Sequence, residues 1–292
     1  MQIEITDVFL RDGLQDEPVI VPTAGKVQIA RAATAAGIGR MEIASFVNPK
    51  RVPQMADADD VVTALSGEPG VRFTVLALNG RGIARAVAAG ASEVQVVASA
   101  SQAHSNANAG AGIEQALDSL AADVAAHPQP GFFAGISTAF TCPFEGEIDP
   151  SRLLRLVRAF KSMGITDIGL ADTLGTTPPR RLISSVKRIQ DAEPDLAYSL
   201  HLHNAHGQAL DTVKLAIDAG ITRFDAALGG YGGCPFAPGA AGNLSTGELV
   251  DFLHAEGHTT GIDPAALAEA NDLARATISS APPVQPDSLS IH

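Results

Sequence analysis

A unit of helix, glycine and short hydrophobic strand recurs along this chain. Four stretches that mix polar and apolar residues, as helices do, end at Gly37, Gly90, Gly164 and Gly220. Each is followed within a few residues by a run rich in Ile, Val, Leu or Phe. Glycine readily takes the left-handed conformation that ends many helices, and short runs of this composition are typical of strands. The pattern predicts strands at residues 40–44, 93–97, 166–170 and 222–226.

Four further apolar runs lie between these units, at residues 4–9, 72–76, 132–138 and 197–203. Helices are expected between the strands, at residues 23–36, 112–126, 150–163, 207–218 and 246–256, with another starting at Pro178. Eight strands alternating with helices predict an α/β fold of the TIM (β/α)₈ barrel type, and a doubly wound open sheet is the alternative. An extra helix is expected at 264–277. We therefore predict one catalytic domain at 1–278 and a proline-rich tail at 279–292.

The composition agrees with such a barrel and excludes one class of partner. The 292 residues are 46% hydrophobic, contain no tryptophan and are only 4% aromatic, so the core must consist of Ala, Val, Ile and Leu. That suits buried parallel strands covered by helices. The net charge of −12 argues against a nucleic-acid partner, because phosphate binding needs a positive surface.

The chain shows no sign of export or of membrane insertion. Its first ten residues include Glu4 and Asp7 and lack the basic and apolar segments of a secretory signal. No apolar run approaches the ~20 residues that span a bilayer. Cys142 and Cys234 each precede a proline and do not suggest a disulfide scaffold. These features predict a cytoplasmic protein that uses no membrane.

The first candidate for chemistry is His201-Leu-His203 at the end of the seventh expected strand. Side chains alternate along a strand, so the two imidazoles project to the same side and could hold a metal ion. Such a pair alone is a weak motif. In a (β/α)₈ barrel, however, active sites lie at the carboxyl ends of the strands. Other chemically active groups follow those ends, namely Arg11-Asp12, Glu42, Asp172 and the glycine-rich segment around Cys234.

These segments resemble the hydroxymethylglutaryl-CoA lyase family, part of a barrel metallolyase superfamily that includes isopropylmalate and homocitrate synthases. The resemblance spans residues 9 to about 250. It is carried by residues 11–15 (Arg-Asp-Gly-Leu-Gln), 42–50, 52–56, 171–175, His201-x-His203, Gly207-Gln208, 232–235 (Gly-Gly-Cys-Pro) and 239–243. The first and last of these segments are specific to the lyase branch, whereas His-x-His is shared with the synthases.

The resemblance implies a site residue by residue. Asp12, His201, His203 and Asn243 would be the ligands of a divalent cation, Mg²⁺ or Mn²⁺, which suit a mixed nitrogen and oxygen donor set with open positions. Arg11 would stabilise an enolate oxygen, and Cys234 would deliver a proton. Glu42 and Asp172 are candidates for the general base or for orienting Arg11. Lys50, Gln15 and Asn108 would bind the acyl-CoA substrate.

The implied reaction is a retro-Claisen cleavage of 3-hydroxy-3-methylglutaryl-CoA, or of a related 3-hydroxy-3-alkylglutaryl-CoA. The products would be acetyl-CoA and a 3-oxo acid, acetoacetate for the methyl compound. The family also suggests a homodimer.

The chain departs from the family pattern at several points. Asn204 stands where these lyases usually carry Asp, His206 where they carry Tyr, and Asp16 where they carry Asn, while residues 99–110 lack the usual Lys or Arg. Two alternatives therefore stay open. One is a synthase that condenses acetyl-CoA with a 2-oxo acid, and the other is a non-catalytic barrel that binds acyl-CoA or metal. Cys234 favours the lyase, because binding alone needs no proton donor.

Overall fold

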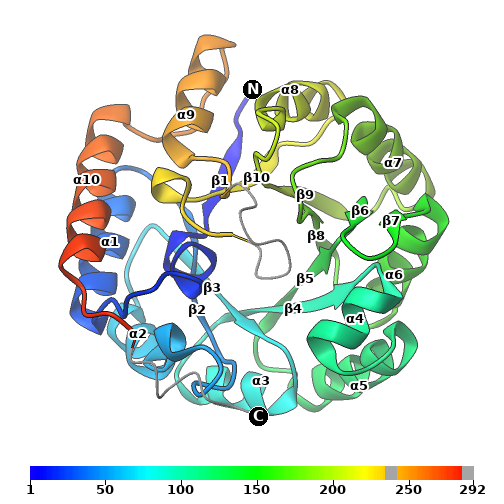
Figure 1. Cartoon of the computed structure of the whole chain (residues 1–292), viewed down its shortest axis with the longest axis horizontal. Helices are drawn as coiled ribbons and strands as arrows, with labels where there is room; N and C mark the ends of the chain where they lie inside the picture. Colours follow the sequence, from blue (N-terminus) through cyan, green and yellow to red (C-terminus); the bar gives the residue numbers. More distant parts are fainter. Residues whose placement is uncertain (234–241, 285–292) are drawn as a thin grey trace.

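Eight parallel strands close into a barrel with helices around it (Figure 1). The computed structural model describes residues 1–233 and 242–284, without the side chains of residues 108 and 109. The order around the barrel is β1, β2, β3, β4, β5, β8, β9 and β10, and β10 pairs with β1 to close the ring. The strands are β1 Glu4–Asp7, β2 Arg40–Ser45, β3 Arg72–Ala77, β4 Glu93–Ser99, β5 Gly131–Ser137, β8 Asp167–Asp172, β9 Ala197–Leu202 and β10 Arg223–Ala226. The TIM-barrel prediction is confirmed, and the open sheet is excluded.

The helices lie outside the ring, each covering the strands beside it (Figure 1). They are α1 Thr23–Ala35, α2 Ala58–Leu65, α3 Gly80–Ala88, α5 Ile113–Ala126, α6 Pro150–Ser162, α7 Pro179–Ala192, α8 Ala209–Asp218 and α9 Thr246–Ala255. The predicted extra helix is α10, Pro264–Ser280, which packs against α1. Within the described ranges, none of the helices has the length and hydropathy needed to cross a lipid bilayer.

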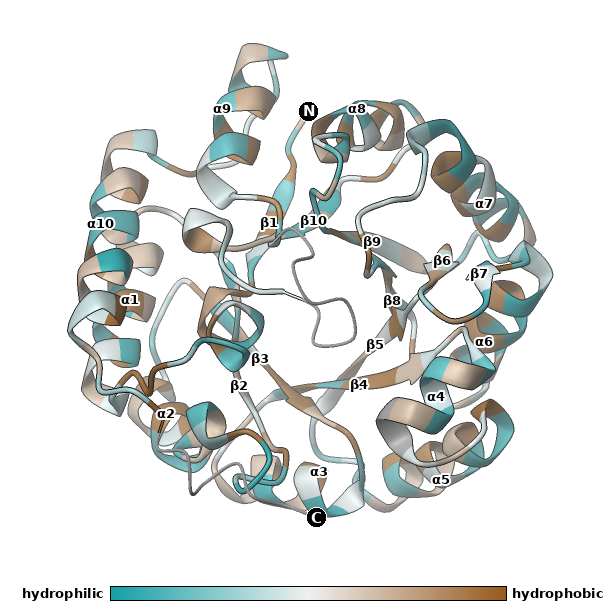
Figure 2. Cartoon of the chain, viewed as in Figure 1, coloured by the Kyte–Doolittle hydropathy of each residue, from teal (hydrophilic) through white to brown (hydrophobic). Residues whose placement is uncertain are grey.

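The core between strands and helices consists of the outward-facing strand residues. Each strand carries at least one such residue that is almost fully buried, for example Ile5, Met41, Val75, Val94, Ala134, Ile168, Leu200 and Phe224. Figure 2 shows hydrophobic colour on strands such as β3 and β5, and alternating hydrophobic and hydrophilic colour along the surrounding helices. Because side chains alternate along a strand, the neighbouring positions face the barrel interior. At the carboxyl ends of the strands these inward positions carry polar groups.

Some elements were not expected from the sequence. A five-residue π-helix, η1 Phe9–Gly13, follows β1, and α4 Gln102–Ala109 follows β4. A small antiparallel pair, β6 Thr141–Cys142 and β7 Gly146–Glu147, lies between β5 and α6. Two 3₁₀ turns, η2 Pro53–Met55 and η3 Leu228–Gly230, complete the described elements. All of them lie in the connections that follow strand ends, where the site is expected.

The carboxyl-terminal helix is longer than predicted. α10 runs to Ser280 instead of ending at 277, because the first residue that cannot continue a helix is Pro282. Beyond it, the Ile20 N–H donates to the Pro282 carbonyl (2.8 Å) and the Val284 N–H to the Pro18 carbonyl (2.9 Å). The predicted division at residue 278 therefore falls inside a helix, and residues up to 284 are bonded to the barrel.

A buried carboxyl group joins the first strand to α9. Asp7, the last residue of β1, accepts hydrogen bonds from the Phe9 N–H (3.0 Å) and from the Thr246 hydroxyl (2.7 Å). Burial raises the pKa of Asp7 from 3.8 to about 6, although both hydrogen bonds lower it. The folded protein therefore holds a proton on Asp7 more tightly than the unfolded chain does.

This carboxyl group should make stability depend on pH in a defined direction. The stability that it contributes is complete below pH 3.8 and is lost as the pH rises through about 6. The free energy of unfolding of the wild type, relative to that of Asp7→Asn, should thus fall by about 2 kcal/mol from pH 4 to pH 7. Urea unfolding of both proteins across this range measures the difference. A difference that does not change with pH contradicts a raised pKa.

Candidate metal centre and active-site cavity

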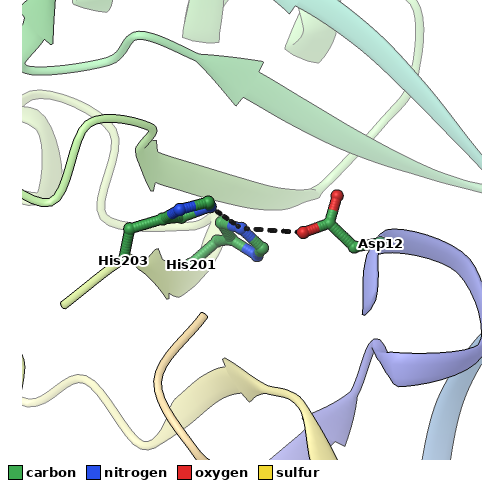
Figure 3. Close-up of side chains that lie close together, drawn as sticks. All are labelled: Asp12, His201 and His203. Carbon is green, nitrogen blue, oxygen red and sulfur yellow. Dashed lines mark hydrogen bonds and ion pairs between the residues drawn. The ribbon is translucent and has the colours of Figure 1, made fainter. Parts of the chain in front are cut away.

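Two histidines and one aspartate meet at the carboxyl end of the barrel (Figure 3). His201 lies on β9 and His203 directly after it, and their Nε2 atoms are 3.2 Å apart. The Asp12 Oδ2 atom lies 3.9 Å from Nε2 of His201. The possible ligand atoms of the three residues all lie within 4.8 Å of one another. The three side chains are therefore placed to bind one metal ion.

The π-helix after β1 places Asp12 in this cluster. The Val8 carbonyl accepts hydrogen bonds from the N–H groups of Arg11 (3.3 Å), Asp12 (2.8 Å) and Gly13 (3.2 Å). This wide turn follows the strand at once and keeps both charged side chains at the barrel mouth. It explains why the Arg-Asp-Gly segment, unlike an ordinary loop, can hold its side chains in fixed places.

Asn243 joins the cluster from the other end of the sequence. It pairs with His203 as an isolated bridge, and the Leu244 N–H donates to the Leu202 carbonyl (3.0 Å). The Asn243 amide nitrogen donates to Oδ2 of Asp12 (2.7 Å) and to the Tyr231 carbonyl (2.9 Å). All four residues that the sequence suggested as metal ligands are thus in one place.

Arg11 bridges two carboxylates beside the cluster. Its Nε donates to Oε2 of Glu42 (2.6 Å), its Nη2 lies 2.5 Å from the same oxygen, and its Nη1 pairs with Asp12. Burial alone would lower the pKa of Arg11, but the charges of Asp12 and Glu42 raise it well above its usual range. Burial alone would raise the pKa of Asp12, but the charges of Arg11 and the two histidines outweigh it and hold this pKa well below its usual range. The site therefore holds a fixed cation beside an ionised carboxylate.

Asp225 is a site residue that the sequence reading missed. It lies on β10 in register with His201, and its Oδ2 is 3.3 Å from Nδ1 of His201. Burial lowers the pKa of His201, but the hydrogen bond to Asp225 and the charge of Asp12 raise it. The available signal was alternation: Phe224 and Ala226 are buried against the helices, so the acid between them must face inward.

Replacing this carboxylate should weaken metal binding without abolishing it. Asp225→Asn removes the charge that orients His201, and groups in this role typically contribute 10- to 100-fold to metal affinity. We expect the Kd for Mn²⁺ to rise by about that factor in calorimetric titration. Asp167→Asn is the matched control, because that acid pairs with Arg223 at the opposite end of the barrel. Equal Mn²⁺ affinities in the two variants would show that Asp225 does not contribute to metal binding.

A cavity of about 1100 Å³ opens at this end of the barrel. Its lining includes Arg11, Asp12, Gln15, both histidines and Asp225, and it extends outward past Asn48, Arg51, Arg81 and Arg85. Arg85 pairs with Asp59, whereas Arg51 and Arg81 form no ion pair with any described residue. The outer part of the cavity therefore presents cationic groups that have no anionic partner in the described chain.

The other residues singled out from the sequence lie in different surroundings. Glu42 is buried behind Arg11, and Asp172 accepts hydrogen bonds from the Thr177 hydroxyl (2.7 Å) and N–H (3.2 Å). Lys50 is exposed and does not line the cavity. Cys142 is free and buried, and its thiol lies 2.9 Å from the Ser101 hydroxyl. Cys234 and the side chain of Asn108 lie outside the described residues.

Two residues that depart from the family pattern, Asn204 and His206, lie outside the lining of the cavity. The Asn204 side-chain oxygen accepts the Ala209 N–H (3.2 Å), which anchors the start of α8. A carboxylate could accept the same bond, so Asn204 retains the hydrogen-bonding function of Asp here. His206 is exposed. Neither residue is among those that line the cavity.

Fold and site together define a (β/α)₈-barrel protein with a two-histidine, one-carboxylate centre at the carboxyl ends of its strands. The family model described as HMGL-like matches residues 2–274, and the chain belongs to that family. It is 37% identical over 276 residues to the mitochondrial hydroxymethylglutaryl-CoA lyase of Mus musculus, covering 93% of this chain and 84% of that one.

Two further comparisons extend this likeness. The cytoplasmic 3-hydroxy-3-methylglutaryl-CoA lyase of Homo sapiens is 37% identical over 275 residues, which cover 92% of this chain and 74% of the relative. The solved structure of an HMG-CoA lyase from Acinetobacter baumannii, in complex with coenzyme A and 3-methylmalate, superposes with a TM-score of 0.91 at 36% identity. That match covers 100% of this chain and 97% of the other.

Proposed function

We propose that this protein is a carbon–carbon lyase that cleaves 3-hydroxy-3-methylglutaryl-CoA into acetyl-CoA and acetoacetate. The observation that carries the proposal is the cluster of Asp12, His201 and His203 beside the buried guanidinium of Arg11. The relatives described above are named for this reaction, and the chain matches them over nearly its whole length.

The donor set fits a divalent cation of the Mg²⁺ or Mn²⁺ type. A carboxylate, two imidazoles and an amide leave open positions for substrate oxygens, which a closed tetrahedral site would not. To bind the ion, Asn243 would present its amide oxygen. Its amide nitrogen would then give up the hydrogen bond that it donates to Asp12. When bound, the ion would lower the pKa of the substrate's 3-hydroxyl and hold the neighbouring carboxylate.

The residues of the chain would then divide the chemistry of the cleavage. Loss of the 3-hydroxyl proton lets the bond between C2 and C3 break, so that C3 becomes a ketone and the electron pair moves into a thioester enolate. Arg11 stabilises that enolate oxygen, and Glu42 holds Arg11 in place. Cys234 gives a proton to C2, which completes acetyl-CoA. Asp172 stays a candidate base; burial raises its pKa despite the bonds from Thr177.

The outer part of the cavity would hold the coenzyme A moiety. Coenzyme A carries several phosphate charges, and Arg51 and Arg81 are cations at the rim without an ion-pair partner among the described residues. Gln15 lines the same cavity. Contacts from Lys50 and Asn108 to the thioester, a cytoplasmic location and a homodimer stay predictions. The matching relatives include both mitochondrial and cytoplasmic lyases.

One assay tests the proposal directly. The purified protein is incubated with Mn²⁺ or Mg²⁺ and 3-hydroxy-3-methylglutaryl-CoA, and the release of acetyl-CoA is followed. We expect turnover that EDTA abolishes and that added metal restores. Metal binding without acetyl-CoA release would contradict the lyase, and condensation of acetyl-CoA with a 2-oxo acid would establish the synthase instead.

Cys234→Ala should separate metal binding from turnover. The thiol is proposed to act only as a proton donor, and such groups contribute about 10²- to 10⁴-fold to a rate. We expect kcat to fall by about that factor while the Kd for Mn²⁺ changes less than about threefold. Cys142→Ala, which removes the buried thiol, is the control and should keep its turnover. Unchanged kcat in Cys234→Ala would remove the thiol from the mechanism.

A further inference from the structure

A recess extends from the metal centre into the barrel interior, away from the cationic rim. Its walls are the inward-facing Val97, Gly135, Gly169 and Ala171 on β4, β5 and β8, all of which line the cavity. Ala171 pairs in register with His201, and Gly169 pairs with Gly135, so the wall descends directly beside the histidine strand. Gly135, Gly169 and Ala171 carry no side-chain atoms beyond Cβ, so the cavity reaches close to the backbone of these strands.

Aromatic and charged side chains close the recess from below. A Cβ atom added to Gly169 would lie 2.8 Å from Cζ of Phe133, so this ring lies next to the glycine. The guanidinium of Arg40 stacks over the same ring at 5.2 Å from its centre and pairs with Glu93. Phe133, Arg40 and Glu93 are not among the residues that line the cavity, so the recess ends above them.

A side chain whose buried amide oxygen has no partner among the described residues lines this recess. Gln95 on β4 is only 9% exposed and lines the cavity, yet its Oε1 atom receives no hydrogen bond from any described residue. Its Nε2 lies 2.9 Å from the position that a Cβ on Gly135 would occupy. Burying an amide oxygen without a hydrogen-bond partner is unfavourable, so a ligand that pairs with it would bind more tightly.

The proposed reaction determines which part of the substrate reaches this amide. The carbon C3 of the substrate carries four groups. In the proposed reaction the hydroxyl and the carboxymethyl arm would face the metal centre, and the thioester arm would lead to the rim where Arg51 and Arg81 lie. The fourth group, a methyl in 3-hydroxy-3-methylglutaryl-CoA, is left to face the recess. The step from Ala171 down to Gly169 spans two residues, roughly 7 Å of strand, which is much longer than a methyl group.

We infer that the recess selects thioesters whose C3 substituent is a short carbon chain ending in a hydroxyl group, with Gln95 as the specificity-determining residue. This inference rests on the proposed lyase function and deepens it. The carbon chain packs against Gly135, Gly169 and Ala171, and the hydroxyl exchanges hydrogen bonds with the Gln95 amide. A buried hydrogen-bonding group discriminates strongly against an analogue that lacks its partner.

Three substrates test the inference. They are derivatives of 3-hydroxyglutaryl-CoA that carry a methyl, butyl or 3-hydroxypropyl group at C3. The last two have nearly the same length and differ only in the terminal group. For the wild type we expect kcat/KM for the hydroxypropyl compound to exceed that for the butyl compound at least tenfold. Gln95→Met should abolish this preference while cleavage of the methyl compound changes less than threefold.

Gly135→Ala probes the space itself, because its methyl group would crowd Gln95 and Val97. It should lower kcat/KM for both long substrates about tenfold and leave the methyl compound within threefold. Gly131→Ala on the same strand meets only the Ser92 carbonyl, at 3.6 Å, and is the matched control.

The inference, but not the lyase function, is overturned if the wild type cleaves the methyl compound but neither long one, or if it shows no preference for the hydroxyl group. Equal losses with all three substrates in Gln95→Met also overturn it. No cleavage of any thioester by the wild type contradicts the lyase itself.

Discussion

Arg11→Lys should lower kcat by about 10²- to 10³-fold while the protein still binds Mn²⁺, because one well-placed donor to a developing oxyanion typically contributes this much. The planar guanidinium contacts Glu42 through Nε and Nη2 and Asp12 through Nη1, so its position is fixed from two sides. A lysine keeps the charge but cannot reproduce that fork of donors. Steady-state kinetics with saturating metal, paired with calorimetric Mn²⁺ titration, measures the two quantities separately.

Arg40→Lys is the matched control for this variant. Arg40 is also buried and ion-paired, but it lies on β2 at the opposite end of the barrel, over Phe133. Its replacement should keep kcat within about threefold of the wild type. Two findings would contradict the role assigned to Arg11: equal rate losses in the two variants, or a loss in Arg11→Lys that extra metal fully restores.

His203→Ala should have the second large effect, on metal binding itself. Removing one of two imidazoles takes away a ligand atom, which costs more than the 10- to 100-fold expected for the orienting carboxylate Asp225. We expect Mn²⁺ affinity to fall by more than about 100-fold and turnover to disappear at metal concentrations that saturate the wild type. Titration of the metal-free protein and an assay at increasing Mn²⁺ measure both effects.

His206→Ala controls for loss of a histidine in the same segment. His206 is exposed, lies three residues beyond His203 and does not line the cavity. Its replacement should leave Mn²⁺ affinity and kcat unchanged within about twofold. Normal metal binding in His203→Ala would show that the cluster of Figure 3 is not the metal centre.

The repeating pattern of the sequence predicted most of the architecture. Each helix that ended at a glycine was followed by a barrel strand, as Gly37 before β2 and Gly220 before β10 illustrate. That pattern arises from local rules, since helix ends and strand composition depend on neighbouring residues. Strand alternation likewise placed His201 and His203 on one side. Their meeting with Asp12 and Asn243 followed from the resemblance and from barrel closure.

The missed features depend on contacts that lie outside any local pattern. The π-helix after β1 arises because one carbonyl, that of Val8, accepts three successive N–H groups, and its residues carry no distinguishing composition. Alternation could have turned Asp225 toward the interior, but its contact with His201 exists only because β10 pairs with β9. Gln95 could be recognised only once the depth of the cavity was known. Pairing and depth are properties of the closed barrel, which a linear pattern does not contain.

The hydrogen bond between Asp12 and Asn243 joins residues that are 231 positions apart. Synthesis delivers the amino-terminal part of a chain first, so a nascent chain carries Asp12 for most of its time on the ribosome without its partner. The two histidines also emerge late. A half-made barrel therefore holds neither imidazole near Asp12, and it cannot take up an ion at this place. The proposed metal centre is complete only when the last strand pairs with the first, so we expect metal uptake to report completion of the fold.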